Sequence, residues 1–562
     1  MLTDQLKKFA KFAWFLPGFL LWAAFPPLGE GTDVLFALAP LLWVSRRENA
    51  KRSAWRWFQN GLFFWIATLS WMPAIVKNGG PWPLVVLGWF ALAAYCAGYF
   101  ALYGFLTSRY WQWAKSYEVA NYAAYLRLGG VLVVEPVLWC GLELVRSRLL
   151  GGFAWNQLGV VPCNLGFGSP AALGGVYLCS AVVILINGTF AGIAERVWKV
   201  ERSGFPGLRK FGSIETLLAF ALVMGIYSLA KIESEGRRDA RDESDQRDYL
   251  KVALVQRNFP CVFQEKEENP YLVYSNLLQN VAALKPDLVV LSESAMCEFG
   301  PIDQQGAMRF ARFVRAQTGG AALFAGGTRF EEGKTFNSAA VYGEATLSVY
   351  DKVHLVPFGE FVPGDKWFPS LQKLAPVGSC TPGEVKVVAL PVAAPASRVA
   401  ELRVLPTAAS SSVIPLGTAI CFEDTDSALM RKQAALGARV LLFITNDSWF
   451  SKSDETLAHA WQATARAIET GLPVVRVGNS GVTGTITPEG KATWLLGADG
   501  RPLVDRRGTM FDRVRLADKN SPLTFYVRFG DIPLVISFLL LITVLILVKY
   551  ATHYGKHRTL SL

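Results

Sequence analysis

The stretch "GTAICFEDTDS", residues 417–427, joins an apolar run typical of a buried strand to two adjacent carboxylates, Glu423 and Asp424. Cys421 stands where the strand is expected to end and a helix to begin. A buried cysteine is usually a small hydrophobic side chain with no chemistry, but a strand-to-helix turn is also where enzymes display nucleophiles. The rest of the chain decides between these two interpretations.

The second half of the chain, residues 249–530, is expected to form an α/β domain. Apolar runs predict strands at 249–256, 286–294, 321–328, 338–343, 345–353, 417–422, 439–445 and 472–478. Helices are expected between several of them, at 268–284, 303–318, 425–436 and 456–470. Strands that are apolar on both faces and alternate with helices indicate a covered sheet. The Ala-, Pro- and Ser-rich segment 391–415 is expected to be an inserted flexible loop.

The first 230 residues are more apolar and are expected to form a polytopic bundle of membrane helices. Of the 562 residues 52% are hydrophobic, the mean hydropathy is +0.28, and many of the 18 Trp lie in residues 1–160. These values exceed those of ordinary soluble proteins, and tryptophan favours membrane interfaces. Seven spans are expected within 1–230, near 11–25, 31–44, 58–75, 83–107, 130–149, 170–193 and 213–230. A polar linker is expected at 231–248, a last membrane helix at 531–549 and a tail at 550–562.

The basic residues indicate how these helices are oriented. The net charge is +11, and groups of Lys and Arg lie at the N-terminus, in the loops after the second, fourth and sixth spans, and in the tail. Membrane topology explains many of the basic residues, and no nucleic-acid partner is expected. With seven spans before the α/β domain and one after it, all five basic segments lie on one side, which the positive-inside rule assigns to the cytoplasm. The α/β domain is expected outside the cytoplasm, and residues 550–562 inside it.

Four ionisable residues stand at or near the ends of expected strands. Glu293 follows "DLVVL", Lys352 ends "LSVYDK", Cys421 ends "GTAI", and Glu360 lies eight residues after Lys352. A cysteine nucleophile needs a base, because a free thiol has a pKa of about 8.5. A nearby ammonium offsets the repulsion between carboxylate and thiolate and can stabilise an oxyanion. Such a set supplies base, electrophile and nucleophile without histidine, metal or cofactor, and the eight Cys show no zinc spacing. By themselves, these residues can also be a buried Cys, a helix-capping Glu and a surface Lys.

Five segments carry a resemblance to a known family. "DKVHLVPFGEFVP" (351–363), "AICFED" (419–424), "ITNDSWF" (444–450), "RAIETGLPVVRVGNSGVT" (466–483) and, in the membrane half, "GLELVRSRLLGGFAWNQLG" (141–159) resemble segments of the apolipoprotein N-acyltransferases. That family is the membrane branch of the nitrilase, or carbon–nitrogen hydrolase, superfamily. The resemblance covers nearly the whole chain. It implies seven spans, a periplasmic domain with a nitrilase-like α-β-β-α sandwich, a closing helix, and a bacterial inner-membrane location.

The resemblance also implies roles for individual residues. It gives the catalytic positions as Glu293, Lys352 and Cys421, and the supporting positions as Glu360, Glu423 and Phe422. Two departures from the family pattern stand out. Leu291 and Ser292 precede the glutamate where the family often has Trp-Pro, and Phe422 follows the cysteine where it often has Tyr. Neither departure removes a catalytic group, because the backbone N–H of residue 422 would still donate to an oxyanion.

The implied reaction is a two-step transfer. Cys421, with Glu293 as base, would take an acyl chain from a membrane phospholipid, expected to be phosphatidylethanolamine. Lys352 and the Phe422 N–H would hold the oxyanion. The thioester would then acylate the α-amino group of the S-diacylglyceryl cysteine of an apolipoprotein. Nothing in the sequence requires more than a monomer.

A further set of residues has the chemistry to contact these substrates: Trp449, Phe358, Phe361, Glu143, Arg146 and Trp155. The aromatic residues can equally pack against their own domain, together with Trp367 and Phe368. Glu143 and Arg146 lie at the outer end of the fifth span and would either pair with each other or bind a lipid headgroup. Glu135, deeper in that span, has no partner that the sequence identifies.

Two other functions stay open. A membrane-tethered amidase or nitrilase would share the three catalytic residues, with water resolving the thioester, but would give no reason for seven further spans. A non-catalytic transporter or scaffold would not need all five ionisable positions of the resemblance, which are Glu293, Lys352, Glu360, Cys421 and Glu423. A disulfide among Cys261, Cys297 and Cys380 is also open, because sequence cannot choose the pair.

Overall fold

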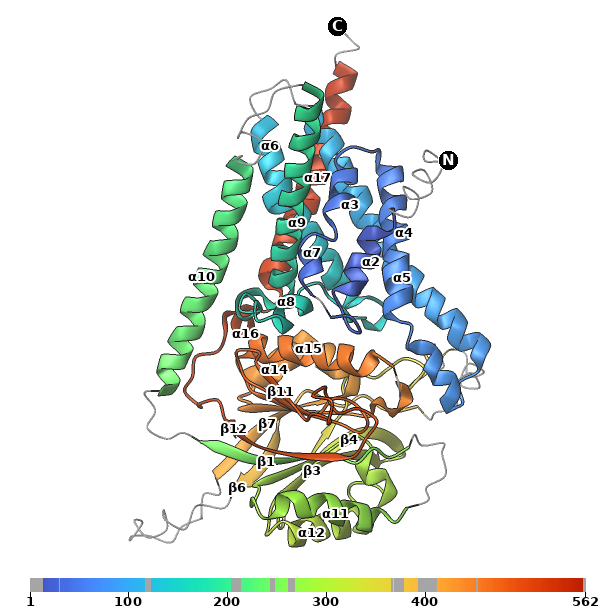
Figure 1. Ribbon diagram of the computed structural model, residues 1–562, viewed down its shortest axis with the longest axis vertical. Helices are drawn as coiled ribbons and strands as arrows, with labels where there is room; N and C mark the ends of the chain where they lie inside the picture. The colour runs from blue at the N-terminus through green and yellow to red at the C-terminus, as the bar shows by residue number, and fades with distance from the viewer. Residues whose placement is uncertain are drawn as a thin grey trace. The chain divides into compact units, whose positions relative to one another are not determined.

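The computed structural model describes residues 14–29, 31–116, 123–203, 214–242, 248–260, 268–364, 367, 379–392, 412–450 and 453–558 (Figure 1). The chain divides into two compact units. The helical unit comprises Met1–Pro73, Pro83–Glu233 and Phe529–Leu562. The sheet unit comprises Ala74–Trp82 and Ser234–Arg528.

The helical unit contains long apolar helices joined by shorter ones. Its helices are α2 (Leu16–Ala23), η1 (Thr32–Leu35), α3 (Ala39–Ser45), α4 (Ala50–Thr68), α5 (Trp82–Lys115), α6 (Ala123–Gly129), α7 (Glu135–Arg146), α8 (Val160–Asn164), α9 (Ala171–Ser203), α10 (Ile214–Asp242) and α17 (Ile532–Arg558). A π-helical turn, η3 (Gly130–Val134), joins α6 to α7, and η4 (Leu149–Gly151) is a short 3-10 turn. A further 3-10 helix, η2 (Met72–Asn78), begins in the helical unit and continues into the Ala74–Trp82 segment of the sheet unit.

Four of the described helices are long and apolar enough to cross a membrane: Trp82–Lys115, Ala124–Arg146, Ala171–Val197 and Ile214–Arg237. They correspond to the last four of the seven expected spans. Shorter apolar helices lie at Thr32–Ser45 and Ile532–Leu547. Helix α4 has the length of a span but carries Lys51, Arg52 and Arg56 in its first two turns, which lowers its hydropathy. The total of seven spans therefore stays a prediction.

The expected linker 231–248 begins as helix. Helix α10 continues through Asp242, because the Glu, Lys and Arg residues of this polar stretch are good helix formers. Residues 243–247 lie outside the described part of the chain.

A buried ion pair holds the helical unit together. Arg46, which follows α3, donates through Nε and Nη2 to the Glu135 carboxylate at 3.1 and 2.8 Å. Its Nη2 also donates to the Gly188 carbonyl of α9 at 2.8 Å, and Trp111 Nε1 donates to Glu135 at 2.9 Å. A Cβ at Gly188 would lie 2.6 Å from Glu135 Oε2, so a side chain there would displace the carboxylate. The partner that the sequence did not identify for Glu135 is thus Arg46.

We expect Glu135→Ala to destabilise the helical unit by about 3–5 kcal/mol, because it leaves the Arg46 guanidinium buried without its carboxylate. Thermal unfolding in detergent, followed by tryptophan fluorescence, measures the loss. The double variant Arg46→Met/Glu135→Leu should recover most of it, and Lys51→Met, at an exposed position, should change nothing. Wild-type stability of Glu135→Ala would contradict the assignment.

The sheet unit contains two six-stranded mixed sheets. The first has the order β12-β1-β2-β3-β4-β5 and the second β11-β10-β9-β8-β7-β6. Strands β1, β2 and β3 are mutually parallel, as are β7, β8 and β9, and the remaining neighbours are antiparallel. The strands are β1 (Tyr249–Gln256), β2 (Leu288–Leu291), β3 (Ala322–Glu331), β4 (Lys334–Tyr342), β5 (Leu347–Asp351), β6 (Val388–Val392), β7 (Ser412–Ile420), β8 (Val440–Thr445), β9 (Val474–Gly478), β10 (Gly484–Ile486), β11 (Ala492–Trp494) and β12 (Gly508–Arg515).

Three apolar cores define the layers of this unit. The central core joins both sheets, with residues such as Leu254 and Val290 of the first and Leu442 of the second. A second core packs α11 (Pro270–Ala282) and α12 (Gln305–Gln317) on the first sheet. A third packs α14 (Ser427–Ala435) and α15 (Glu455–Thr470) on the second (Figure 1). The predicted α-β-β-α sandwich is therefore confirmed.

All eight expected strands are present, and four more were missed. Strands β10, β11 and β12 are short or only partly buried, so they lack the apolar runs from which the others were predicted. Strand β6 is apolar, but it is a short edge strand that contains Pro391, a residue that argues against a central strand. The expected loop 391–415 starts inside β6 and ends inside β7, which pair antiparallel. Residues 393–411 lie outside the described part of the chain.

Candidate active site

The turn that carries Cys421 is held by a buried glutamate. Strand β7 ends at Ile420, and a 3-10 helix, η8 (Cys421–Thr425), follows. Cys421 has φ = 54°, a strained value for a residue with a side chain. The Glu423 carboxylate accepts four hydrogen bonds, from the Ile420 N–H at 2.9 Å, the Val353 N–H at 2.7 Å, the His354 N–H at 3.0 Å and the Tyr350 hydroxyl at 3.0 Å. Burial raises the pKa of Glu423 to about 7, opposed by Lys352 and these backbone donors.

A second cluster joins the other predicted carboxylates to Lys352. The Lys352 ammonium donates to Glu360 Oε1 at 2.9 Å and lies 4.0 Å from Glu293 Oε1. The side-chain amide of Asn337, on β4, donates to Glu293 at 2.8 Å and to Glu360 at 2.6 Å. The Val356 N–H donates to the other Glu360 oxygen at 2.7 Å. Three of the predicted residues thus lie together, and Asn337 bridges the two carboxylates.

The two sheets bring Glu293 and Cys421 to one end of the sandwich. Ile420 of β7 pairs with Ile444 of β8, so Cys421 follows beside Thr445. Glu293, which follows β2, accepts a hydrogen bond at 2.9 Å from the Asn446 N–H, just after β8. The two sheets approach each other closely here. A Cβ on Gly326 of β3 would lie 2.8 Å from both the Glu293 Cα and the Ile444 side chain, so the missing side chain leaves room for this approach.

The electrostatics link Cys421 to the lysine cluster. Burial raises the pKa of Cys421 well above its ordinary value, Glu293 and Asp447 raise it further, and Lys352 lowers it. Burial also raises the pKa of Glu293, against the effect of Lys352. Burial lowers the pKa of Lys352, but Glu360 and Glu293 outweigh this and hold the pKa above its usual range. These shifts favour a protonated thiol and a charged ammonium, so a nucleophilic reaction of Cys421 would need a base to take the thiol proton.

Cys380 and Cys421, near this site, are free thiols, and Cys261 lies outside the described residues. The Cys380 N–H donates to the Glu360 carbonyl at 2.6 Å. Burial and Glu360 raise the pKa of Cys380 to about 11. This thiol therefore borders the lysine cluster, which its sequence position did not indicate.

The aromatic residues expected near the substrate differ in exposure. Phe358 is 61% exposed and Trp367 is 81% exposed, whereas Phe361 and Trp449 are half-buried. Phe358 stands at φ = 62° in a tight turn in which its N–H donates to the Phe361 carbonyl at 2.7 Å. Phe368 lies outside the described residues. The phenyl ring of Phe422 meets the His354 ring edge to face at 5.7 Å.

Glu143, Arg146 and Trp155 lie in the helical unit and are buried. Glu143 accepts a hydrogen bond from the Leu158 N–H at 3.0 Å. Arg146 donates to the carbonyls of Phe153 and Trp155 at 2.7 and 2.9 Å. These bonds fix the chain segment 153–158 against α7. Glu143 and Arg146 also line a cavity with aromatic walls that include Trp65 and Trp139.

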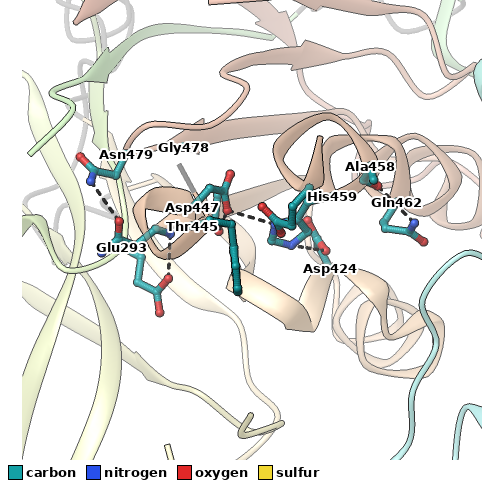
Figure 2. A network of polar contacts seen from close by, with 12 residues as sticks. Glu293, Asp424, Thr445, Asp447, Ala458, His459, Gln462, Gly478 and Asn479 are labelled. Atoms are coloured by element: carbon teal, nitrogen blue, oxygen red, sulfur yellow. Dashed lines mark hydrogen bonds and ion pairs between the residues drawn. The ribbon is translucent and has the colours of Figure 1, made fainter. Parts of the chain in front are cut away.

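Behind the Cys421 turn lies a group of buried charges that the sequence analysis did not single out. Figure 2 shows the contacts that run from Glu293, through the Asn446–Asp447 loop, to His459 and Asp424. Arg476 of β9 pairs with Asp424 and lies 3.7 Å from Asp447. The ligand atoms of Asp447, Glu455 and His459 lie within 4.8 Å of one another, a spacing that would also suit a metal. The cations Arg476 and His459 already neutralise the aspartates, so an ion-pair network accounts for the cluster. Its signal in the sequence was a lone histidine in the alanine-rich helix 455–470, together with Asp residues just past two strand ends.

Comparison with known proteins covers both units. The family model "Apolipoprotein N-acyltransferase N-terminal domain" matches residues 17–189, and "Carbon-nitrogen hydrolase" matches residues 251–509. An apolipoprotein N-acyltransferase of Geobacter metallireducens is 29% identical, with 92% of this chain and 91% of the relative covered. One from Methylococcus capsulatus is 28% identical, with 92% of each covered. Among solved structures, a Nesterenkonia amidase of the nitrilase superfamily is 17% identical, with 48% of this chain and 92% of that chain covered and a TM-score of 0.33.

We expect Glu423→Gln to loosen the Cys421 turn at a cost of about 1–3 kcal/mol, because the new NH2 group faces N–H donors and cannot accept from them. The melting temperature of the sheet unit within the full chain, measured in detergent, reports the loss. Glu384→Gln, at an exposed position of the same unit, is the matched control. Equal melting temperatures for the two variants would contradict a structural role for Glu423.

Proposed function

This chain belongs to the apolipoprotein N-acyltransferase family, and we propose that it N-acylates lipoproteins through a thioester on Cys421. Family membership makes it a membrane acyltransferase with lipid and lipoprotein substrates. We propose phosphatidylethanolamine as the acyl donor. The proposed acceptor is the α-amino group of the N-terminal S-diacylglyceryl cysteine of an apolipoprotein. The observation that carries the proposal is the cluster of Glu293, Lys352 and Glu360, in which Glu293 and Lys352 both act on the pKa of the Cys421 thiol.

In the first half-reaction Glu293 takes the proton of the Cys421 thiol. A carboxylate whose pKa is raised by burial is a stronger base than an exposed one, which reduces the mismatch with the thiol. The thiolate attacks the ester carbonyl of the phospholipid, and the oxyanion forms beside the Lys352 ammonium and the Phe422 N–H. When the carbon–oxygen bond breaks, Glu293 returns the proton to the departing alcohol. A lysophospholipid and an acyl-Cys421 thioester result.

In the second half-reaction the amine of the lipoprotein attacks the thioester. Glu293 removes a proton from the attacking nitrogen, the carbon–sulfur bond breaks, and that proton passes to the Cys421 sulfur. The products are an amide and the free thiol, so each group returns to its starting state. Lys352 stabilises the oxyanion in both halves without losing its proton, since Glu360 and Glu293 keep it charged. Glu360, Glu423 and Asn337 support the reaction by fixing Lys352, the Cys421 turn and Glu293.

Exposed aromatic side chains favour lipid substrates over the soluble substrates of an amidase. Phe358 and Trp367 offer apolar surface on the same chain segment as Glu360, and Phe361 and Trp449 lie partly beneath the surface. Acyl chains need such a surface, because each methylene removed from water contributes about 0.8 kcal/mol. For Glu143, Arg146 and Trp155, the bonds to the 153–158 backbone favour a structural role over contact with a headgroup.

The proposed setting is the bacterial inner membrane, with residues 249–530 in the periplasm and a monomer as the working unit. The basic loops support this orientation through the positive-inside rule. A thioester enzyme in the periplasm requires a free nucleophile, and Cys421 is a free thiol. The amidase alternative differs in one step, because water would then discharge the thioester. A transporter or scaffold would form no thioester at all.

We expect intact-protein mass spectrometry to detect one acyl adduct after incubation with phosphatidylethanolamine, because Cys421 becomes a thioester. Hydroxylamine should remove the adduct, and Cys421→Ala should not form it. Adding a diacylated lipopeptide should discharge the adduct into an N-acyl amide. Release of free fatty acid instead would favour the hydrolase, and no adduct on folded protein would refute the thioester.

We expect Phe358→Asn to slow adduct formation from phospholipid vesicles about tenfold or more, because the exposed ring no longer holds the acyl chain. Asparagine tolerates the positive φ at this position, so the turn should stay intact. Phe330→Asn is the matched control, since Phe330 is 53% exposed on β3 of the same unit. Equal rates for the two variants, measured by the same mass assay, would exclude Phe358 from lipid binding.

A further inference from the structure

The buried charges behind the Cys421 turn form one network on four structural elements. Asp424 lies on η8, Asp447 on η9 (Asp447–Phe450), Glu455 and His459 on α15, and Arg476 on β9. All five side chains are buried. Burying this many charges is unfavourable unless they are paired, and networks of this kind fix segments relative to one another.

His459 is the centre of the network. Its Nε2 lies 3.1 Å from Asp424 Oδ1, and its Nδ1 lies 3.1 Å from Asp447 Oδ1 and 3.4 Å from Glu455 Oε1. Carboxylate oxygens within 3.1 Å of both ring nitrogens favour the imidazolium, because its positive charge attracts both aspartates. Burial lowers the pKa of His459, but Asp424 and Asp447 raise it to about 10, against the effect of Arg476.

The two aspartates belong to the two segments that the proposed chemistry needs. Asp424 follows Cys421 by three residues in the same 3-10 helix. Asp447 follows Asn446, whose N–H donates to Glu293 at 2.9 Å. Asp447 also accepts the Thr445 hydroxyl at 2.6 Å. His459 therefore connects the turn of the nucleophile with the loop that orients the base.

We propose that His459 is a positioning residue that, as a cation between Asp424 and Asp447, holds the Cys421 turn in register with the loop that orients Glu293. This inference rests on the proposed function only in naming Cys421 as the reacting thiol. His459 itself does not touch the substrate. It holds the two aspartates in place, and its positive charge offsets their negative charge near the Cys421 thiol.

The charge balance of the network makes this role measurable. Burial and Asp447 raise the pKa of Glu455 to about 8, so Glu455 is mostly uncharged at neutral pH. The negative charges of Asp424 and Asp447 then face the two positive charges of His459 and Arg476. The groups that face Cys421 are Glu293 and Lys352 from the first sheet and Asp447 from the second. Asp447 lies against Gly481, where a Cβ would be 1.7 Å from its Oδ2. Loss of the His459 charge therefore leaves Asp424 and Asp447 with Arg476 as their one cation, a net negative charge near the thiol.

The test is the pH profile of Cys421 alkylation in the full-length protein in detergent. Iodoacetamide modification is followed peptide by peptide with mass spectrometry, and no lipid or lipoprotein is needed. We expect His459→Gln to shift the profile to higher pH and to slow alkylation at neutral pH about threefold or more, since half a pKa unit changes the thiolate fraction by about that factor. Asp447→Asn removes the opposing charge, so we expect a shift of similar size to lower pH.

A control variant separates positioning from loss of stability. Leu278→Ala truncates the apolar core under α11, so it should lower the melting temperature without moving the Cys421 profile. Shifts in the same direction for His459→Gln and Asp447→Asn, or an unmoved profile in both, would overturn the proposal. A shifted profile in a protein that forms no acyl adduct would uphold it while refuting the proposed acyl transfer.

Discussion

The pairing of the Lys352 ammonium with two carboxylates is the interaction on which the candidate site depends. The ammonium is 1% exposed and lies 2.9 Å from Glu360 and 4.0 Å from Glu293. An isolated ammonium or carboxylate in such a place would be strongly unfavourable. Asn337 donates to both carboxylates, so their relative position is fixed by hydrogen bonds as well as by charge. The same pairing keeps Lys352 protonated and so available to stabilise an oxyanion.

The second constraint is the close approach of the two sheets. Glu293 follows a strand of the first sheet and Cys421 a strand of the second, so neither sheet contains the site alone. The absence of a side chain at Gly326 lets the backbone of Glu293 approach Ile444. The hydrogen bond from the Asn446 N–H to Glu293 then joins the sheets at their polar end. The central apolar core packs the two sheets together, so packing far from the thiol contributes to the geometry of the candidate site.

Both units use buried ion pairs to connect segments that are distant in sequence. In the helical unit, Arg46 joins the end of α3 to Glu135 of α7 and to the Gly188 carbonyl of α9. In the sheet unit, His459 and Arg476 join the turn after β7 to the loop after β8. In each case removing one partner leaves the other charged and buried, which makes these pairs sensitive to substitution. They specify which segments meet, whereas the apolar cores supply most of the stability.

The sequence by itself determined the α/β character of residues 249–530, because apolar runs and strand-to-helix turns are local patterns. It also determined Cys421, Lys352 and Glu293 as candidates, since each stands at or near a strand end and in a segment that resembles a family motif. The short strands β10 and β11 carried no such pattern, and neither did Asn337, His459 or the partner of Glu135. Only the tertiary structure decided that Arg46 meets Glu135 and that His459 meets Asp424 and Asp447. These contacts join residues far apart in the chain, and their energy comes from burial and pairing, which no local pattern of residues records.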